Sequence, residues 1–172
     1  MAVEAAGAFL LLFIILAGVV DVSMLFRTTY EVSTASRAGA RLASAEPMAL
    51  NFAADAAQQV AASMSDMDGT QITKLWVYKA NTTSPGDPTS GTSCPSQCVK
   101  FTVSGTGVVT AVSGTSWLSR QACAGGTVDS VGVRVQFRHH APIMFGEGAL
   151  VEETTVMRLE QIPATLTCVS TP

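Results

Sequence analysis

Charged side chains are scarce in this sequence of 172 residues, and they are unevenly distributed. Asp, Glu, Lys and Arg make up 13% of the chain, against about a quarter in an average soluble domain. Ahead of Arg27 there is no basic residue, and the only acidic residues are Glu4 and Asp21. The net charge of −3 argues against a nucleic-acid-binding protein, which would carry a basic stripe. The low charge content also argues against a charged disordered tail.

Catalytic motifs are absent from the sequence as well. It has no glycine-rich phosphate loop, no nucleophile elbow and no His-Glu metal motif. His139 and His140 are adjacent, so on a strand they point to opposite faces and cannot easily share one metal ion. The acidic turn at 66–69 lacks the glutamate that completes a calcium loop. We therefore expect a protein that is not an enzyme and that binds neither a metal nor a cofactor.

An apolar run near the N-terminus accounts for most of the hydrophobicity. Residues 5–20 read AAGAFLLLFIILAGVV, and apolar residues continue past Asp21 to Phe26. About 20 such residues are needed to cross a bilayer. The run is apolar on all sides, which indicates a buried or membrane helix rather than an amphipathic surface helix.

Three interpretations of this run compete. A cleaved signal peptide begins with basic residues, whereas this chain begins Met1-Ala2-Val3-Glu4. A plain anchor has its basic residues on the cytoplasmic side, and here they follow the run, which would place the C-terminal part in the cytoplasm. The four cysteines favour an oxidising, extracytoplasmic compartment instead. A third interpretation removes the conflict: a short basic leader preceded Met1 and has been removed.

The helical pattern continues beyond the apolar run. Val32, Ala35 and Leu42 recur at helical spacing, and no proline occurs before Pro47. One helix over 2–45 would be roughly 65 Å long, about twice the thickness of a bilayer core. Small residues between 35 and 44 would let helix backbones approach closely. Neither half shows a one-sided apolar stripe, so we expect a packing helix of a multi-subunit assembly rather than an anchor followed by an ordinary domain helix.

After Pro47 the pattern predicts a small α+β head with few aromatic residues. A second, short helix is expected over 48–67, and beyond Gly69 the apolar period changes from helical spacing to alternation. Strands are predicted at 72–80, 99–104, 131–138 and 150–159, with 108–112 as a hairpin partner. Because strands follow strands, the sheet should be antiparallel with one face on the helices. The segment 81–93 (NTTSPGDPTSGTS) is expected to be an exposed loop without core residues.

The cysteines allow three pairings, and spacing alone does not choose between them. A local Cys94–Cys98 disulfide would leave Cys123–Cys168, whereas Cys98–Cys123 would leave Cys94–Cys168. Each crosslink stabilises a small sheet domain by about 2–4 kcal/mol.

Several of these segments together resemble the TadE-like pilins of the tight-adherence branch of the type IV pilus superfamily. The N-terminal ones are Ala2-Val3-Glu4, Val19-Val20-Asp21, Leu25-Phe26 and the small, Arg-containing segment Ala35–Arg41; the C-terminal ones are Val131–Val135 and Val156–Glu160. Cys98, Trp117 and Cys123 also occupy positions where larger TadE-like proteins tend to have Cys and Trp. The resemblance covers both ends of the chain, and residues 48–97 only poorly.

The resemblance implies a prepilin whose short leader is removed by a prepilin peptidase. The mature helix would stay in the inner membrane and then pack in a filament core with the help of the pilus assembly machinery. The family usually has its glutamate at the fifth mature position, whereas Glu4 is fourth if Met1 is the mature N-terminus, and the usual proline in the apolar run is absent. The resemblance also favours the Cys98–Cys123 disulfide.

We therefore predict a structural pilin with a helix over 1–46 and an extracellular α+β head over 47–172. It would form a homo-oligomeric helical filament on the cell surface and support surface adhesion, without nucleic acid. The residues expected to make the assembly contacts are Glu4, Ala5, Phe9, Leu12, Ile15, Val19 and Phe26. The alternatives are a membrane-anchored extracytoplasmic binding domain that never polymerises, and a minor or priming pilin.

Overall fold

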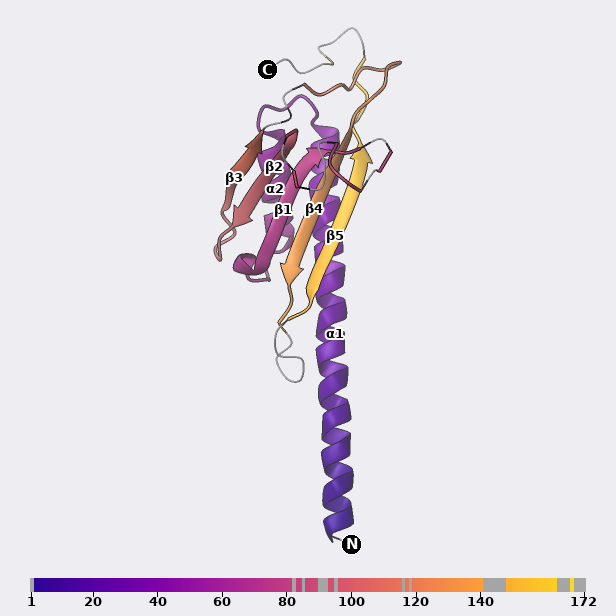
Figure 1. The fold of residues 1–172 in the computed structure, drawn as a ribbon, viewed down its shortest axis with the longest axis vertical. Coiled ribbons are helices and arrows are strands. Elements are labelled where there is room, and N and C mark those ends of the chain that lie inside the picture. Colours follow the sequence, from indigo (N-terminus) through magenta and orange to yellow (C-terminus); the bar gives the residue numbers. More distant parts are fainter. Residues whose placement is uncertain are drawn as a thin grey trace.

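The structure is a computed structural model that describes residues 2–81, 83–84, 86–89, 93–94, 96–115, 117, 119–140, 148–163 and 168, with side chains described from residue 7 onward. Its first element is the helix α1, Ala2–Ala45, a single helix of 44 residues as predicted. At 1.5 Å per residue, α1 is about 66 Å long. Its N-terminal half projects from the head, and its C-terminal half lies behind the sheet (Figure 1).

The head follows in the chain order of the remaining elements. They are α2 (Phe52–Ser63), the 3-10 turn η1 (Gly69–Gln71), β1 (Ile72–Lys79), β2 (Cys98–Val103), β3 (Val109–Thr115), β4 (Ser130–Arg138) and β5 (Leu150–Arg158). The strands form one sheet in the order β3-β2-β1-β4-β5, and every neighbouring pair is antiparallel. The predicted α+β class, including the hairpin between β2 and β3, is confirmed.

Both helices cover the same face of the sheet. The helix α1 packs against β4 and β5, and α2 packs against β1, β2 and β3 (Figure 1). Alternate strand residues point into this layer, as the period of two requires. The buried core includes Val32, Ala35, Ala40 and Ala43 from α1, Phe52, Ala56, Ala57 and Val60 from α2, and Leu75, Val77, Phe101, Val131, Val133, Val135 and Phe137 from the strands.

The expectation that neither half of α1 has a one-sided buried face was wrong for the C-terminal half. Its buried side chains all face the head, and its small residues bring α2 close. A Cβ atom added at Gly39 would lie 2.5 Å from Cγ2 of Val60 and 3.0 Å from the Ala56 carbonyl oxygen. Small residues in this half therefore serve packing within the chain.

The second helix is shorter than the predicted 48–67, because a distant arginine organises the segment before it. The guanidinium of Arg120 donates to the backbone carbonyl oxygens of Pro47, Trp117 (2.8 Å) and Ala49 (3.0 Å). It also lies 4.5 Å from the ring centroid of Phe52. Burial lowers the pKa of Arg120 from its ordinary value. These contacts hold the connection from α1 to α2 in turns, so α2 begins only at Phe52.

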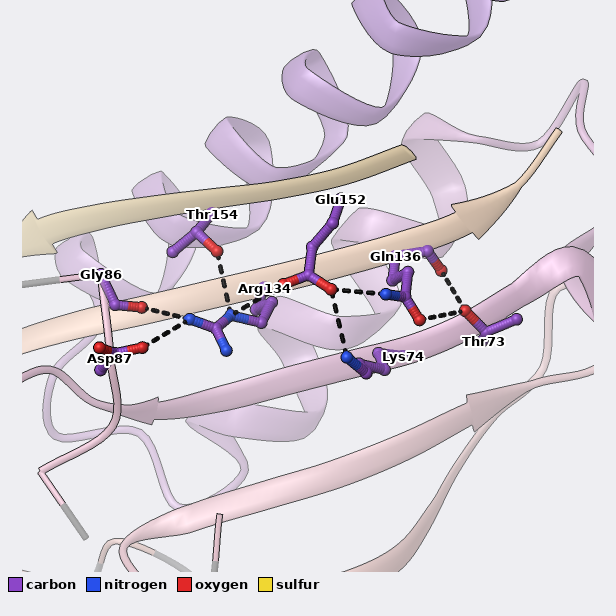
Figure 2. A network of polar contacts seen from close by, with 8 residues as sticks. All are labelled: Thr73, Lys74, Gly86, Asp87, Arg134, Gln136, Glu152 and Thr154. Atoms are coloured by element: carbon purple, nitrogen blue, oxygen red, sulfur yellow. Dashed lines mark hydrogen bonds and ion pairs between the residues drawn. The ribbon is translucent and has the colours of Figure 1, made fainter. Parts of the chain in front are cut away.

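The loop at 81–93 was predicted to be an exposed tip, but its described part folds back over the sheet. Pro88 is fully buried, so the loop does contribute to packing. The hydroxyl of Tyr78 on β1 donates to the Gly86 carbonyl oxygen at 2.7 Å. Arg134 on β4 donates to the same oxygen at 2.7 Å and to the carboxylate of Asp87 at 3.0 Å (Figure 2). Two strands thus bind the loop to the face opposite the helices.

This contact has a measurable consequence at alkaline pH. Burial raises the pKa of Tyr78, because the phenolate would lose its hydration. In a Tyr30→Phe variant, where Tyr78 is the only tyrosine, ultraviolet titration should give a midpoint above the ordinary value of about 10. The folded chain then keeps a proton that the unfolded chain releases, so the free energy of unfolding should fall as pH rises above about 10. A midpoint at or below 10 would contradict this burial.

The disulfides differ from the pairing that the resemblance favoured. The structure has Cys94–Cys98 and Cys123–Cys168, with Cα–Cα distances of 5.4 and 4.9 Å. The side chain of Cys98 lies on the sheet face away from the helices, in a small cluster with Tyr78 and Cys94. Cys123 instead lies beside the C-terminal segment, where the Ala122 amide donates to the Cys168 carbonyl oxygen at 3.0 Å. The structure thus has one of the pairings that the spacing left open, and the Cys98–Cys123 pairing that the resemblance favoured, which would leave Cys94–Cys168, is wrong.

Candidate functional site

The exposed N-terminal half of α1 is the most unusual surface of the chain. Large apolar side chains point outward in every direction along two dozen Å of helix, a length estimated at 1.5 Å per residue. They include Phe9, Leu10, Leu11, Leu12, Phe13, Ile14, Ile15, Leu16, Val19, Val20, Val22, Met24 and Phe26. Soluble monomers rarely expose such a continuous apolar area, so this half of α1 requires a lipid or protein environment.

By length and composition, the described part of α1 could cross a membrane. The candidate span is Gly7–Ala45. Only about 20 residues are needed for a bilayer, and the C-terminal part of α1 is packed against the head. The apolar stretch ends at Phe26, where the guanidinium of Arg27 donates to the carboxylate of Glu31 at 2.6 Å. Among the side chains that the structure describes on α1, the first exposed ion pair therefore follows directly after the apolar half.

Five of the predicted assembly residues have described side chains, and all five are exposed. They are Phe9, Leu12, Ile15, Val19 and Phe26. The side chains of the other two, Glu4 and Ala5, lie outside the described residues, although the backbone of both is helical. At roughly 100° per residue, the set from Ala5 to Phe26 follows one side of the helix, which we name the assembly stripe.

The structure brings three residues of the assembly stripe together around a hollow. Ile15, Val19 and Phe26 line a surface depression of about 400 Å³, together with Gly18, Val22 and Ser23. The missing side chain of Gly18 leaves room between the larger neighbours, so the helix surface is notched. A depression of this size has the shape that ridges-into-grooves packing of two helices uses.

A second set of residues on α1 is buried and lies on the other side. We name Ala17, Asp21, Thr28, Val32 and Ala35 the buried stripe, because the side chains of all five are buried. Counting roughly 100° per residue, its centre is about 180° from that of the assembly stripe. The head therefore covers one side of the helix and leaves the assembly stripe uncovered.

Polar contacts fix the rotation of α1 relative to the head. The hydroxyl of Thr28 lies 2.9 Å from Nδ1 of His139, which follows β4, and both side chains are buried. Closer to the C-terminus of α1, the hydroxyl of Ser36 lies 2.8 Å from the hydroxyl of Thr155 on β5. These directional contacts point the buried stripe at the sheet, and so they also orient the assembly stripe away from it.

These polar contacts between α1 and the head were not predicted from the sequence. His139 was considered only as a metal ligand, but its ring contacts Thr28, while Nε2 of His140 lies 3.0 Å from the Gln71 side-chain oxygen. Within the described ranges, no three His, Cys, Asp or Glu side chains gather where they could hold a metal ion. The helical spacing of Asp21, Thr28 and Val32 is the one signal that could have revealed the buried side of the helix.

A long apolar helix, packed along its C-terminal half against a five-stranded antiparallel sheet, defines a pilin-like α+β protein. The model of the TadE-like protein family matches residues 1–41 of this chain, which confirms the predicted resemblance over that part. The matched residues contain the whole apolar half of α1. Neither the curated proteins nor the solved structures gave a match to this chain. The hydrophobic helix and two disulfides are features of a membrane-anchored, extracytoplasmic protein of this kind.

Proposed function

We propose that this chain is a structural pilin that assembles into an extracellular filament of the tight-adherence type. In this proposal the helices α1 of many copies pack in the filament core, and the heads form the outer surface that supports adhesion. The observation that carries the proposal is the uncovered assembly stripe, notched at Gly18 and directed away from the chain's own head. The TadE-like match over the same helix supports it.

The energetics of the stripe favour assembly once the helix leaves the lipid. Burying one large apolar side chain stabilises a contact by about 1.5–3 kcal/mol. Before assembly the bilayer covers these side chains, and afterwards the helices of neighbouring copies do. The same helix thus serves first as an inner-membrane anchor and then as a filament core element, with the tight-adherence machinery moving it between the two environments.

We assign Glu4 the role of an assembly contact. A carboxylate at the start of an apolar helix is costly unless it meets a cation. Within a helical filament, the terminal ammonium of a neighbouring copy could supply that cation. Between Glu4 and Arg27 the helix has no basic side chain that could supply this cation instead.

Replacement of Glu4 tests this function. We expect Glu4→Ala and Glu4→Gln to block or greatly slow filament assembly while the protein remains in the membrane, because the neighbour's ammonium loses its partner. Glu46→Ala is the matched control, since Glu46 is exposed and follows the end of α1. Filaments sheared from cells would be counted by negative-stain imaging, and membrane levels by immunoblot. If the Glu4→Ala variant forms normal filaments, Glu4 is not an assembly contact.

A further inference from the structure

The sheet has a second face, opposite the helices, which we name the open face. It consists of the strand side chains that alternate with the buried core, and half of the basic residues of the chain lie on it. They are Lys74, Lys100, Arg134, Arg138 and Arg158. Figure 2 shows the centre of this face, where polar side chains from β1, β4 and β5 contact one another.

A tryptophan lies among these cations. Trp76 on β1 is the direct cross-strand neighbour of Lys100 on β2 and of Arg134 on β4. The Lys100 ammonium is 5.2 Å from the centre of the indole ring and the Arg134 guanidinium is 5.9 Å from it, within the range of cation–π attraction. The ammonium of Lys74 is 5.6 Å from the same ring. The indole ring of Trp76 therefore has a positively charged side chain beside it on each of the two neighbouring strands.

The open face differs in charge from the rest of the chain. Among the described side chains, its five basic residues are opposed by two acidic ones, Glu152 on β5 and Asp87 in the loop above, which leaves a net charge of +3. The other described side chains include five basic and nine acidic residues, with a net charge of −4. A protein that is acidic overall therefore concentrates positive potential on one surface.

Only some of the basic side chains on the open face form ion pairs within the chain. Arg134 pairs with Asp87 at 3.0 Å and with Glu152 at 3.7 Å, and Lys74 pairs with Glu152 at 3.2 Å. Across the part of the chain that the structure describes, Lys100, Arg138 and Arg158 have no carboxylate partner. At about 3.4 Å per residue and 4.8 Å per strand, the strand positions of these three residues are at least roughly 13 Å from each other.

We propose that the open face binds an acidic polysaccharide whose charges are carboxylates. Lys100, Arg138 and Arg158 would meet widely spaced carboxylates in charge-assisted hydrogen bonds. The electron-rich indole of Trp76 suits the C–H edges of a sugar ring. Between the cations, Thr154 and Gln136 can donate to and accept from sugar hydroxyls.

The same features disfavour a nucleic acid on this face. A DNA strand carries a phosphate every roughly 3.4 Å along the helix axis, far denser than the unpaired cations. Glu152 and Asp87 lie beside the cations and would repel a dense row of anions, whereas they can accept hydrogen bonds from the hydroxyls of a sparsely charged sugar polymer. The mixed charge of the open face therefore matches a polymer with few charges and many hydroxyl groups.

Binding of the full-length chain, held in a non-ionic detergent, to immobilised methyl-esterified polygalacturonate tests the proposal; most of its carboxylates are esters, so the remaining charges are widely spaced. Dextran of similar length is the neutral probe, and single-stranded DNA is the nucleic-acid probe. We expect binding to the esterified polygalacturonate that weakens about tenfold or more in the Lys100→Glu/Arg158→Glu variant. The Arg37→Glu/Arg41→Glu variant makes the same change in charge on exposed residues of α1 and should bind as the parent does. Circular dichroism would confirm that each variant is folded.

The Trp76→Phe variant gives a second readout. It keeps a ring on the face but reduces the stacking area, so we expect weaker binding with an unchanged dependence on salt. Absence of binding by the parent chain, equal weakening in both double variants, or tighter binding to DNA than to the esterified polygalacturonate would each overturn the proposal. The test uses single chains in detergent, so failure here would leave the proposed filament role in place.

Discussion

Replacement of Leu12 by aspartate is expected to abolish filaments, whereas replacement of Leu10 by aspartate is expected to leave filaments that are fewer but normal. Both leucines lie in the apolar half of α1, and both are largely exposed, at 51% and 65%. A carboxylate in a membrane helix costs about 2.5–3.5 kcal/mol at insertion, and the two sites lie at nearly the same depth. Insertion should therefore suffer equally in both variants.

The difference arises after the helix leaves the membrane. Leu12 belongs to the assembly stripe, while Leu10 is roughly 200° away around the helix, on the side of the buried stripe. A carboxylate enclosed between helices without a partner costs several kcal/mol, and each factor of ten in an equilibrium needs only about 1.4 kcal/mol. Immunoblots would measure membrane levels and imaging of sheared material would count filaments. Equal losses in both variants would show that the stripe has no special role.

Replacement of Gly39 by leucine is expected to destabilise the head strongly. The new Cβ would lie 2.5 Å from Cγ2 of Val60, and the neighbouring Ala56 carbonyl belongs to backbone that cannot move independently. Overpacking of this kind costs about 1–3 kcal/mol or more. In a chain of this length, a loss of about 3 kcal/mol lowers the melting temperature by roughly 6–12 °C.

Gly7 provides the matched control within the same helix. Among the described residues, no atom beyond the adjoining turn of α1 lies within 4 Å of a Cβ atom added there, so Gly7→Leu should leave the head unchanged. Thermal unfolding followed by near-ultraviolet circular dichroism would report on Trp117, which is buried in the head and contacts Phe52 edge to face at 5.7 Å. A Gly39→Leu protein that melts with the parent would contradict the close packing of α1 on α2.

The elements that could be predicted are those specified by local periodicity. The apolar run and the absence of proline before Pro47 predicted one long helix, and alternation predicted the strands, because these patterns depend on neighbours in sequence. The bounds of α2 could not be predicted, since they depend on the carbonyl groups that Arg120 binds about 70 residues away. Sequence reasoning has no signal for such a contact.

The disulfide pairing and the packing of the loop also could not be predicted, because both depend on which side chains the paired strands place on one face. Cys98 and Cys123 were paired on the basis of resemblance, but the register of β2 with β1 places Cys98 on the open face, beside Cys94. Likewise, Pro88 is buried because Tyr78 and Arg134 bind the adjacent Gly86. Composition correctly indicated a loop, yet it could not reveal the strands beneath it.

The assembly stripe was predicted as a set of apolar residues, and the structure adds its direction. Exposure alone would not distinguish Leu12 from Leu10, since both are apolar and uncovered. The polar contacts of Thr28 with His139 and of Ser36 with Thr155 fix which side of α1 faces the head. The remaining side is therefore the one that we assign to neighbouring copies.

Immunogold labelling of sheared filaments with an antibody against the head tests the central claim most directly. If the chain is a structural pilin, gold particles should line the filaments along their whole length. Label confined to filament ends would indicate a minor or priming pilin. Label that remains in the membrane fraction of cells bearing normal filaments would contradict the account and favour an anchored binding domain.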